Sequence, residues 1–129
     1  MELVTKGAFS MNRFLLWLFA LMLLAAGPAW AQPQAFPAGF KTIEIATNGT
    51  TLHVRTGGSG PAVVLLHGYG ETGDMWGAMA ADLARDHTVV VPDLRGYGRS
   101  DKPEGDASHL TYSKRAMALD QIAIMRALG

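Results

Sequence analysis

The sequence predicts an α/β fold in which an antiparallel hairpin leads into a mostly parallel sheet with flanking helices. Two observations support this prediction. The unbroken apolar run at residues 62–66 and the β-branched run Thr88-Val89-Val90-Val91 are typical of strands buried on both faces of a parallel sheet. Each run is followed by a segment with helical spacing of its apolar residues. This alternation of buried strand and helix predicts that the two strands are parallel.

The hairpin is predicted ahead of the first buried run. Residues 41–46 and 51–56 alternate apolar and polar side chains, as half-buried strands do. Asn48-Gly49 between them is a strong signal for a tight hairpin turn. We expect residues 41–129 to form the N-terminal portion of one domain. Residues 32–40 contain prolines and a glycine without periodicity, so we expect a flexible lead-in there.

Two helices and one long loop complete the pattern. A helix is predicted over residues 74–85, another over about 113–128, and a polar, glycine-rich loop over about 94–110. The apolar residues of the first helix are spaced for one helical face: Met75, Trp76, Met79, Ala80 and Leu83. Lys114 and Arg115 are predicted to belong to a solvated face of the second helix.

Composition excludes several classes of partner and cofactor. The 129 residues suffice for one domain at most. Eleven basic and eleven acidic residues cancel, so charge suggests no nucleic-acid partner. Without cysteine, the chain can form neither a disulfide nor a cysteine-ligated metal site, and its four histidines lie far apart in sequence. We therefore expect no metal and no cofactor.

The N-terminus has the parts of a secretory signal peptide. Arg13 precedes an apolar run over residues 14–26, and Ala29-Trp30-Ala31 supplies a small-residue cleavage site. A membrane anchor is the alternative, but the run covers about 20 Å against a hydrocarbon core of ~30 Å. We predict a signal peptide over residues 1–31, with Met11 as an alternative start. The mature protein should be periplasmic or secreted, with no stable membrane span.

Three motifs then follow in order. His67-Gly68-Tyr69-Gly70 ends the first buried run, and D-L-R-G-Y-G-R-S-D-K-P at residues 93–103 follows the second. The stretch Y-S-K-R-A-M-A-L-D at residues 112–120 opens the last helix. Together they resemble the α/β-hydrolase superfamily over residues 42–129. The branch that they resemble most contains epoxide hydrolases, haloalkane dehalogenases and fluoroacetate dehalogenases.

The resemblance assigns roles around the first motif. In this fold, a backbone N–H from the loop after the third strand stabilises negative charge on a reacting oxygen. The resemblance makes Tyr69 that donor, with Gly68 and Gly70 allowing close approach of a ligand. His67 is interpreted as a residue that shapes the turn rather than as the catalytic base. Many relatives have proline where this chain has Gly70, so its loop should be freer.

The other motif residues are interpreted as a scaffold near the site. Asp93 and Arg95 are expected to pair with neighbouring loop groups, and the glycines after them to permit tight turns. Trp76 either lines a substrate pocket or packs its helix. Ser59 and Ser100 lie outside a G-x-S-x-G pattern and are not proposed as nucleophiles.

The resemblance places the nucleophile after a further strand, beyond Gly129. We therefore expect an incomplete α/β-hydrolase domain from an enzyme that hydrolyses a small molecule with an aspartate nucleophile. A serine esterase of the same fold, and a non-catalytic fragment or binding protein, are the alternatives. The isolated chain should be inactive, and an unpaired edge on its third strand should make it prone to aggregation. The sequence does not predict the oligomeric state.

Overall fold

A four-stranded mixed sheet forms the centre of the computed structural model, which describes residues 35–129; the predicted signal peptide lies outside the described residues. Its strands are β1 (Lys41–Thr47), β2 (Thr50–Gly58), β3 (Ala62–Val64) and β4 (Thr88–Pro92). They lie in the order β1-β2-β4-β3. β2 pairs antiparallel with both β1 and β4, whereas β3 pairs parallel with β4. The predicted α/β architecture is thus confirmed.

The predicted hairpin forms around Asn48 and Gly49. Both residues adopt the left-handed backbone conformation, with φ of 45° and 72°. A two-residue hairpin turn of this kind needs positive φ at both positions, which asparagine and glycine tolerate best. The turn fixes the register, in which Thr47 lies opposite Thr50.

The first predicted helix is divided in two. A 3-10 turn, η1 (Gly73–Trp76), leads directly into the short helix α2 (Gly77–Leu83). Ala80 of this segment is fully buried, but Met75 and Met79 remain about half exposed, at 49% and 50%. The five apolar residues that are spaced for one helical face are therefore not all buried. The change from three to 3.6 residues per turn shifts the side-chain direction between the two parts.

The second helix, α3 (Lys114–Leu128), forms as predicted. The Ser113 side chain accepts a hydrogen bond from the Ala116 N–H at 3.2 Å and so caps the first turn. Lys114 and Arg115 are exposed, as expected. The buried positions of α3 are Asp120 and Ile124.

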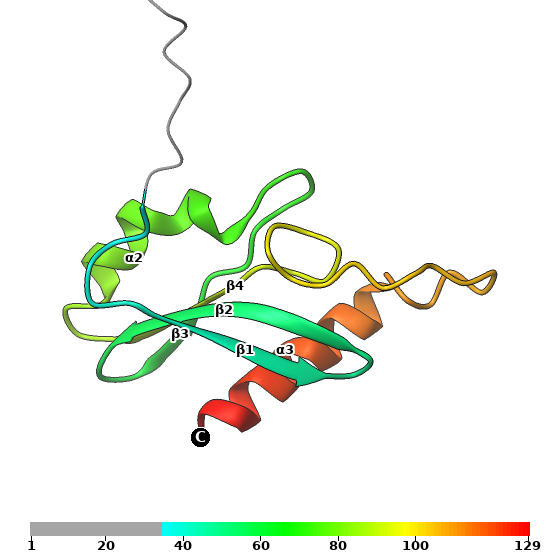
Figure 1. Cartoon of the computed structure of the whole chain (residues 1–129). Coiled ribbons are helices and arrows are strands. Elements are labelled where there is room, and N and C mark those ends of the chain that lie inside the picture. The colour runs from blue at the N-terminus through cyan, green and yellow to red at the C-terminus, as the bar shows by residue number, and fades with distance from the viewer. Residues whose placement is uncertain (1–34) are drawn as a thin grey trace, which may run out of the picture. The chain divides into compact units, whose positions relative to one another are not determined.

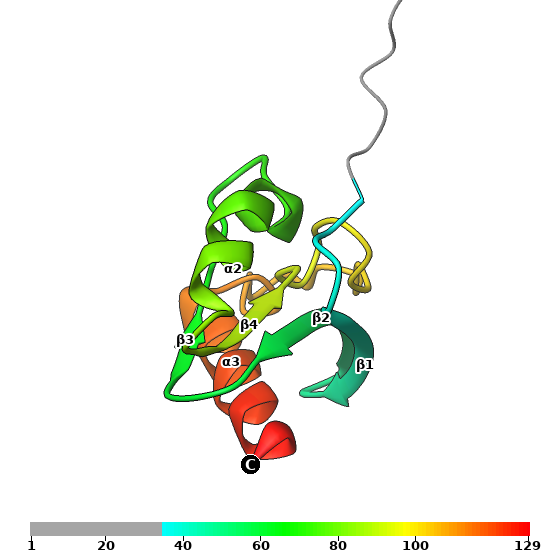
Figure 2. The same ribbon diagram turned by 90° about the vertical axis from the view of Figure 1, so that its left-hand side faces the viewer.

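The helices cover opposite faces of the sheet (Figures 1 and 2). On the α3 face, Ile124 packs against Leu52, Val54 and Val90. On the α2 face, the buried cluster consists of Leu65, Ala80, Val89 and Val91. Successive valines of β4 thus point to opposite faces, as the strand period of two requires. β4 is buried on both faces, which the unbroken apolar run predicted.

The prediction that residues 62–66 form a strand buried on both faces was wrong. β3 has three residues and lies at the edge of the sheet, where it pairs with β4 alone. Ala62 is exposed, and Leu66 just beyond the strand is 45% exposed. Nothing among residues 35–129 pairs with the other side of β3, so its apolar side chains are covered less than those of β4.

The segment before β1 has no regular secondary structure but is tied to the domain. The rings of Phe36 and Phe40 meet edge to face, with centroids 5.0 Å apart. Both pack against the cluster on the α2 face, and the Arg55 guanidinium lies 4.8 Å from the centroid of the Phe36 ring. A flexible lead-in was expected here, so the packing of these two rings amends that expectation for residues 36–40.

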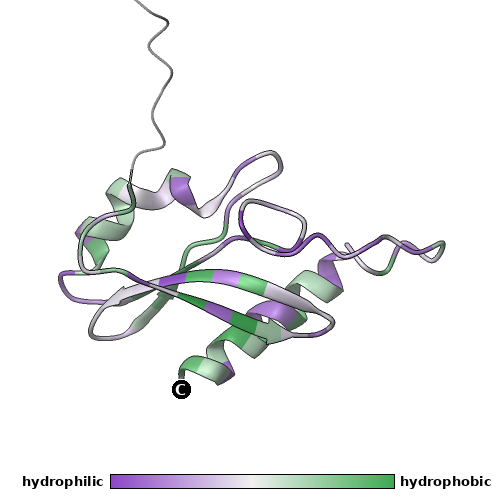
Figure 3. Ribbon diagram, viewed as in Figure 1, coloured by the Kyte–Doolittle hydropathy of each residue, from purple (hydrophilic) through white to green (hydrophobic). Residues whose placement is uncertain are grey.

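Polar residues are distributed unevenly over the strands and loops. Hydrophilic and hydrophobic residues alternate along β1 and β2, whereas the loop that follows β4 is largely hydrophilic (Figure 3). Within residues 35–129, no helix combines the length and apolar character that a bilayer crossing requires.

Candidate active site

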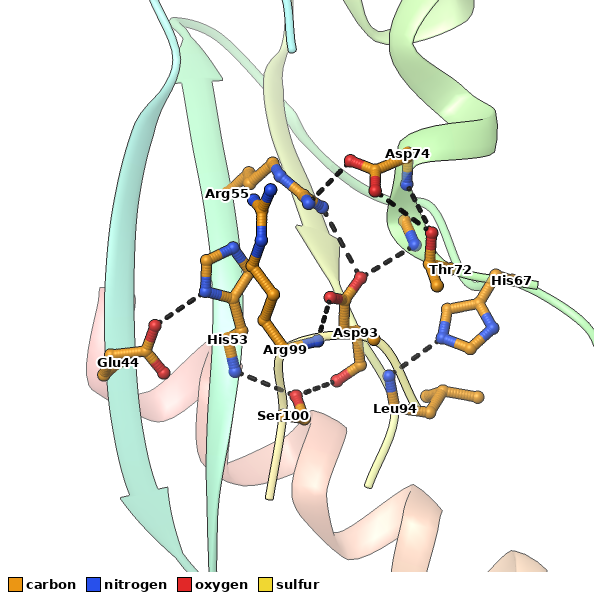
Figure 4. Close-up of polar contacts among 12 residues, drawn as sticks. Glu44, His53, Arg55, His67, Thr72, Asp74, Asp93, Leu94, Arg99 and Ser100 are labelled. Atoms are coloured by element: carbon orange, nitrogen blue, oxygen red, sulfur yellow. Dashed lines mark hydrogen bonds and ion pairs between the residues drawn. The ribbon is translucent and has the colours of Figure 1, made fainter. Parts of the chain in front are cut away.

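The three sequence motifs are brought together at the carboxyl ends of β3 and β4. Because these strands are parallel and adjacent, the loops that follow them leave the sheet side by side. Residues 65–72 lead from β3 to η1, and residues 93–103 form the loop after β4. Ligands of α/β proteins bind at this edge of the sheet. Figure 4 shows the polar contacts that join the two loops.

Asp93 lies at the centre of these contacts. One carboxylate oxygen accepts the Gly73 N–H at 2.8 Å, and the other accepts the Arg99 N–H at 2.9 Å. The side chain is only 1% exposed. Burial by itself raises the pKa of Asp93, but these two hydrogen bonds and the nearby positive charge of Arg55 outweigh it and lower the pKa below the usual value. Asp93 is therefore a buried carboxylate that joins the η1 segment to the loop after β4.

Two glycines make this arrangement possible. A Cβ atom on Gly98 would lie 2.2 Å from an Asp93 carboxylate oxygen, and the φ of Gly98 is +50°. A Cβ atom on Gly73 would lie 2.8 Å from the Arg55 guanidinium and 3.0 Å from the Asp93 carboxylate. No larger residue fits at Gly98 without displacing the carboxylate. The predicted tight turns at Gly96 and Gly98 are confirmed by positive φ at both.

Arg55 supplies the positive charge, and sequence reasoning missed it. It extends from β2, is almost fully buried, and bonds Asp74 at 2.7 Å while lying 3.5 Å from Asp93. Alternation along β2 suggested that the side chains of its polar face would meet solvent. They are buried because the Asp93 loop and the Phe36 ring cover that face. An arginine on the polar face of an otherwise well-patterned strand was the only signal in the sequence.

Ser100 closes the loop back onto β2. Its hydroxyl donates to the Asp93 carbonyl at 2.6 Å and accepts the His53 N–H at 2.9 Å. The Asp93 N–H in turn donates to the His53 carbonyl at 2.9 Å. This buried hydroxyl thus continues the ladder between β2 and β4, in keeping with the interpretation of Ser100 as a structural residue.

Arg95 forms a second buried ion pair, with Asp120 of α3. Two of its guanidinium nitrogens donate to the two Asp120 carboxylate oxygens, each at 2.6 Å. Two further guanidinium N–H groups donate to the carbonyls of Thr111 at 2.9 Å and Asn48 at 3.1 Å. Hydrogen bonding to Asp120 raises the pKa of Arg95, although burial opposes it. The expected pairing of Arg95 therefore joins the loop, α3 and the hairpin turn.

Asp120 was also missed by sequence reasoning. The only signal was an acidic residue among the apolar positions of a helix. Its partner lies 25 residues earlier, so no local spacing rule could pair the two.

His67 connects the two loops directly. Its side chain is buried, and Nε2 accepts the Leu94 N–H at 2.9 Å. Nδ1 lies 2.9 Å from the Gly68 carbonyl oxygen. The Tyr97 ring packs edge-on against the His67 ring, with centroids 5.2 Å apart. These contacts agree with the interpretation of His67 as a residue that shapes the turn.

Tyr69 lies on the loop after β3, with an exposed side chain and a backbone N–H that is unpaired within the described residues. The side chain is 96% exposed and meets only the edge of Tyr97, at 6.4 Å between centroids. Its N–H has no hydrogen-bond acceptor within residues 35–129. An open cavity of about 570 Å³ adjoins the loop. It is lined by Tyr69, Gly70, Gly96, Tyr97, Lys102, Tyr112, Lys114 and Met117.

The remaining predicted residues lie in distinct surroundings. Gly68 is exposed, and a Cβ atom there would meet nothing within 4 Å. Gly70 has φ of +77°, a conformation closed to the proline found in many relatives, because proline holds φ near −65°. Trp76 is half-buried against the cluster on the α2 face, so it occupies the helix-packing position of its two alternatives. A role in lining a substrate pocket stays a prediction.

Comparison with known proteins adds three findings. A protein-family model described as the alpha/beta hydrolase fold matches residues 61–129. A fluoroacetate dehalogenase from Burkholderia sp is 48% identical over 91 residues, which are 70% of this chain and 30% of that protein. An epoxide hydrolase from Caballeronia sordidicola is 46% identical over 74 residues, or 57% of this chain and 22% of that protein.

Solved structures agree with the same fold. An epoxide hydrolase from Vigna radiata superposes with a TM-score of 0.66 and 32% identity, covering 74% of this chain and 29% of that one. A proposed acyltransferase from Salmonella enterica superposes with a TM-score of 0.71 and 49% identity, covering 74% and 32%. The chain thus spans about a third or less of the length of these relatives.

Because Gly98 lies so close to the Asp93 carboxylate, adding a single methyl group at residue 98 should lower the stability of the fold. Gly98→Ala should lower the free energy of unfolding by about 2–3 kcal/mol, because the residue has positive φ and its new Cβ meets the carboxylate. Gly105→Ala is the matched control, since a Cβ there meets nothing within 4 Å. Pulse proteolysis in urea at submicromolar chain concentration measures both. Equal stability of the two variants would contradict the assigned contact.

The lowered pKa of Asp93 predicts a pH-dependent contribution to stability. Asp93→Asn should cost about 3 kcal/mol at neutral pH, because it leaves Arg55 and two backbone donors without the buried charge. A lowered native pKa stabilises the fold above the unfolded value of about 3.9, and this contribution is lost as pH falls through the native value. The difference between wild type and variant should therefore be constant from pH 7 to 5 and shrink below about pH 4.

Urea unfolding followed by circular dichroism measures this difference. Asp82→Asn, at an exposed surface pair with Arg85, serves as the control and should change stability by less than about 0.5 kcal/mol. A difference for Asp93→Asn that stays constant down to pH 3 would show that the carboxylate does not titrate as described.

Proposed function

The chain belongs to the α/β-hydrolase family, and we propose that it is the N-terminal part of an exported hydrolase related to epoxide hydrolases and dehalogenases. The fold and the order of the motifs support this branch. In the proposal, this part of the enzyme supplies one donor of the oxyanion hole and the scaffold that holds it. The nucleophile is an aspartate carried by residues that follow Gly129 in the whole protein.

The observation that carries the proposal is the backbone N–H of Tyr69, which is unpaired within residues 35–129. Its N–H has no acceptor among the described residues, and it lies beside an open cavity at the carboxyl end of β3. Its position between two glycines, on a loop held by His67, makes it suited to a developing oxyanion.

The proposed reaction has two steps. The aspartate carboxylate attacks a carbon of an epoxide or a halogenated substrate and forms an ester bond. The carbon–oxygen bond of the epoxide breaks and its oxygen takes up a proton, or the carbon–halogen bond breaks and halide leaves. A histidine-activated water then adds to the ester carbonyl and releases the alcohol product, which restores the carboxylate. Negative charge develops on the carbonyl oxygen during the second step, and the Tyr69 N–H stabilises it.

Acyl transfer through a serine nucleophile is the second candidate. The solved structure of the proposed acyltransferase is 49% identical over the superposed part and supports it. The described residues serve both chemistries, because an acyl-enzyme intermediate places the same demand on the oxyanion donor. The two candidates differ in the nucleophile and in the substrate that it attacks.

Export is part of the proposal and is supported by the sequence of residues 1–31. Their cationic start, apolar run and small-residue site fit a signal peptide. Absence of cysteine suits an oxidising compartment. Fractionation of cells followed by N-terminal sequencing should find the mature protein outside the cytoplasm, beginning at Gln32.

The nature of the nucleophile can be tested on the whole protein. Translation of the coding sequence beyond codon 129 should give G-H-D-x-G-G rather than G-x-S-x-G. Under single-turnover conditions in H₂¹⁸O, an epoxide or haloacid should yield product without label, while the aspartate acquires ¹⁸O. The purified 129-residue chain, the matched control, should show no turnover. A burst of p-nitrophenol from an ester, with acylated serine and no epoxide or haloacid turnover, would favour the esterase.

Substitutions at residue 69 should separate the backbone donor from the side chain. In the whole protein, Tyr69→Pro removes the N–H and should lower kcat by about 100- to 1,000-fold. Tyr69→Ala keeps the N–H, removes only an exposed ring, and should stay within about tenfold of wild type. Circular dichroism verifies that both variants fold. Equal activity of the two variants would exclude the Tyr69 N–H as the donor.

A further inference from the structure

The direction of the Tyr69 N–H is determined by the peptide group that contains it. The Gly68 carbonyl and the Tyr69 N–H belong to one planar peptide unit, which is trans because residues 35–129 contain no cis peptide bond. In such a unit the C=O and N–H bonds point in opposite directions. A contact that holds the Gly68 carbonyl therefore also aims the Tyr69 N–H.

The carbonyl is held mainly by His67. Nδ1 of His67 lies 2.9 Å from the Gly68 oxygen, whereas the second donor, the Glu71 N–H, is longer at 3.4 Å. The Gly68 oxygen is an acceptor only, so Nδ1 must carry a proton for this bond to form. Gly68 itself adds no side-chain restraint, and a Cβ there would meet nothing within 4 Å.

The proton position on His67 is set by the neighbouring loop. A backbone N–H is a donor only, and that of Leu94 points at Nε2 from 2.9 Å. Nε2 must therefore be unprotonated, which leaves the single ring proton on Nδ1. Tyr97 packs against the ring and restrains its plane.

We propose that His67 is a positioning residue, which passes the restraint of the Leu94 N–H through its Nδ1–H tautomer to the Gly68–Tyr69 peptide and so aims the oxyanion donor. This inference rests on the proposed function of Tyr69. It assigns His67 a role in the rate of reaction without contact with substrate. Hydrogen bonds in such a chain also polarise one another, which strengthens the final donor.

The first test is spectroscopic and does not depend on activity. In the whole protein labelled with ¹⁵N-histidine, the ring ¹⁵N shifts distinguish protonated from unprotonated nitrogens. The His67 resonances are those lost in His67→Asn. Protonated Nδ1 and unprotonated Nε2 at neutral pH are expected. An Nε2–H tautomer or a doubly protonated ring would overturn the proposal, whether or not the protein is a hydrolase.

The second test compares variants of the whole enzyme. His67→Asn places an amide N–H near the position of Nδ1 and should keep kcat within about threefold of wild type. His67→Leu removes both hydrogen bonds and should lower kcat by about 10- to 100-fold with KM nearly unchanged, since misaimed groups act on the transition state. Equal loss in both variants, or none in His67→Leu, would overturn the proposal.

Stability and activity are separated by a third variant. Val63→Ala lies in β3, the strand before the loop, and is half-buried, so it should lower stability while leaving kcat unchanged below its unfolding temperature. A fall in kcat in Val63→Ala that matches His67→Leu would show that loss of stability alone explains the effect. If wild type hydrolyses nothing, the proposed function fails, and the tautomer measurement still decides the geometry of His67.

Discussion

The buried carboxylate of Asp93 is the interaction on which the rest of the site depends. A charge so fully removed from water is costly unless its lone pairs are satisfied and an opposite charge lies nearby. Here two backbone N–H groups and Arg55 meet that demand, and they come from three segments: η1, the loop after β4, and β2. Because the cost returns if any partner moves away, satisfying one side chain fixes the relative positions of all three segments.

The same principle operates a second time on the other side of the loop. Arg95 brings a guanidinium into the interior, and Asp120 neutralises it with two short bonds. Two further N–H groups donate to the carbonyls of Asn48 and Thr111, so four of the five guanidinium donors are paired within the described residues. The loop after β4 thus carries one charge of each sign into the protein, at Asp93 and Arg95. Each charge is matched by a partner on a different element. These two pairings hold the loop in place although it has no regular secondary structure.

Sequence reasoning succeeded where structure is decided locally. Asn48-Gly49 specified its turn because few residues tolerate positive φ, and the valines of β4 specified a central strand through their unbroken apolar character. It failed where neighbours distant in sequence decide. Leu66 is exposed because no strand among residues 35–129 pairs with the outer side of β3, not because of its own chemistry. Arg55 and Asp120 looked like surface charges because their partners lie 38 and 25 residues away. The motif residues were found by resemblance, but their contacts required the structure.

The freedom of the Tyr69 loop is therefore smaller than its composition suggests. Glycines on both sides of Tyr69 would allow many backbone conformations in an isolated peptide. In the protein, the Asp93 network fixes the start of the loop after β4, and the Leu94 N–H that follows Asp93 directly is presented to His67. Rigidity at the reacting edge thus comes from a neighbouring strand, while the exposed tyrosine ring contributes little to it. The side chain at position 69 therefore matters less for the geometry of this site than the residues that hold the Gly68–Tyr69 peptide group.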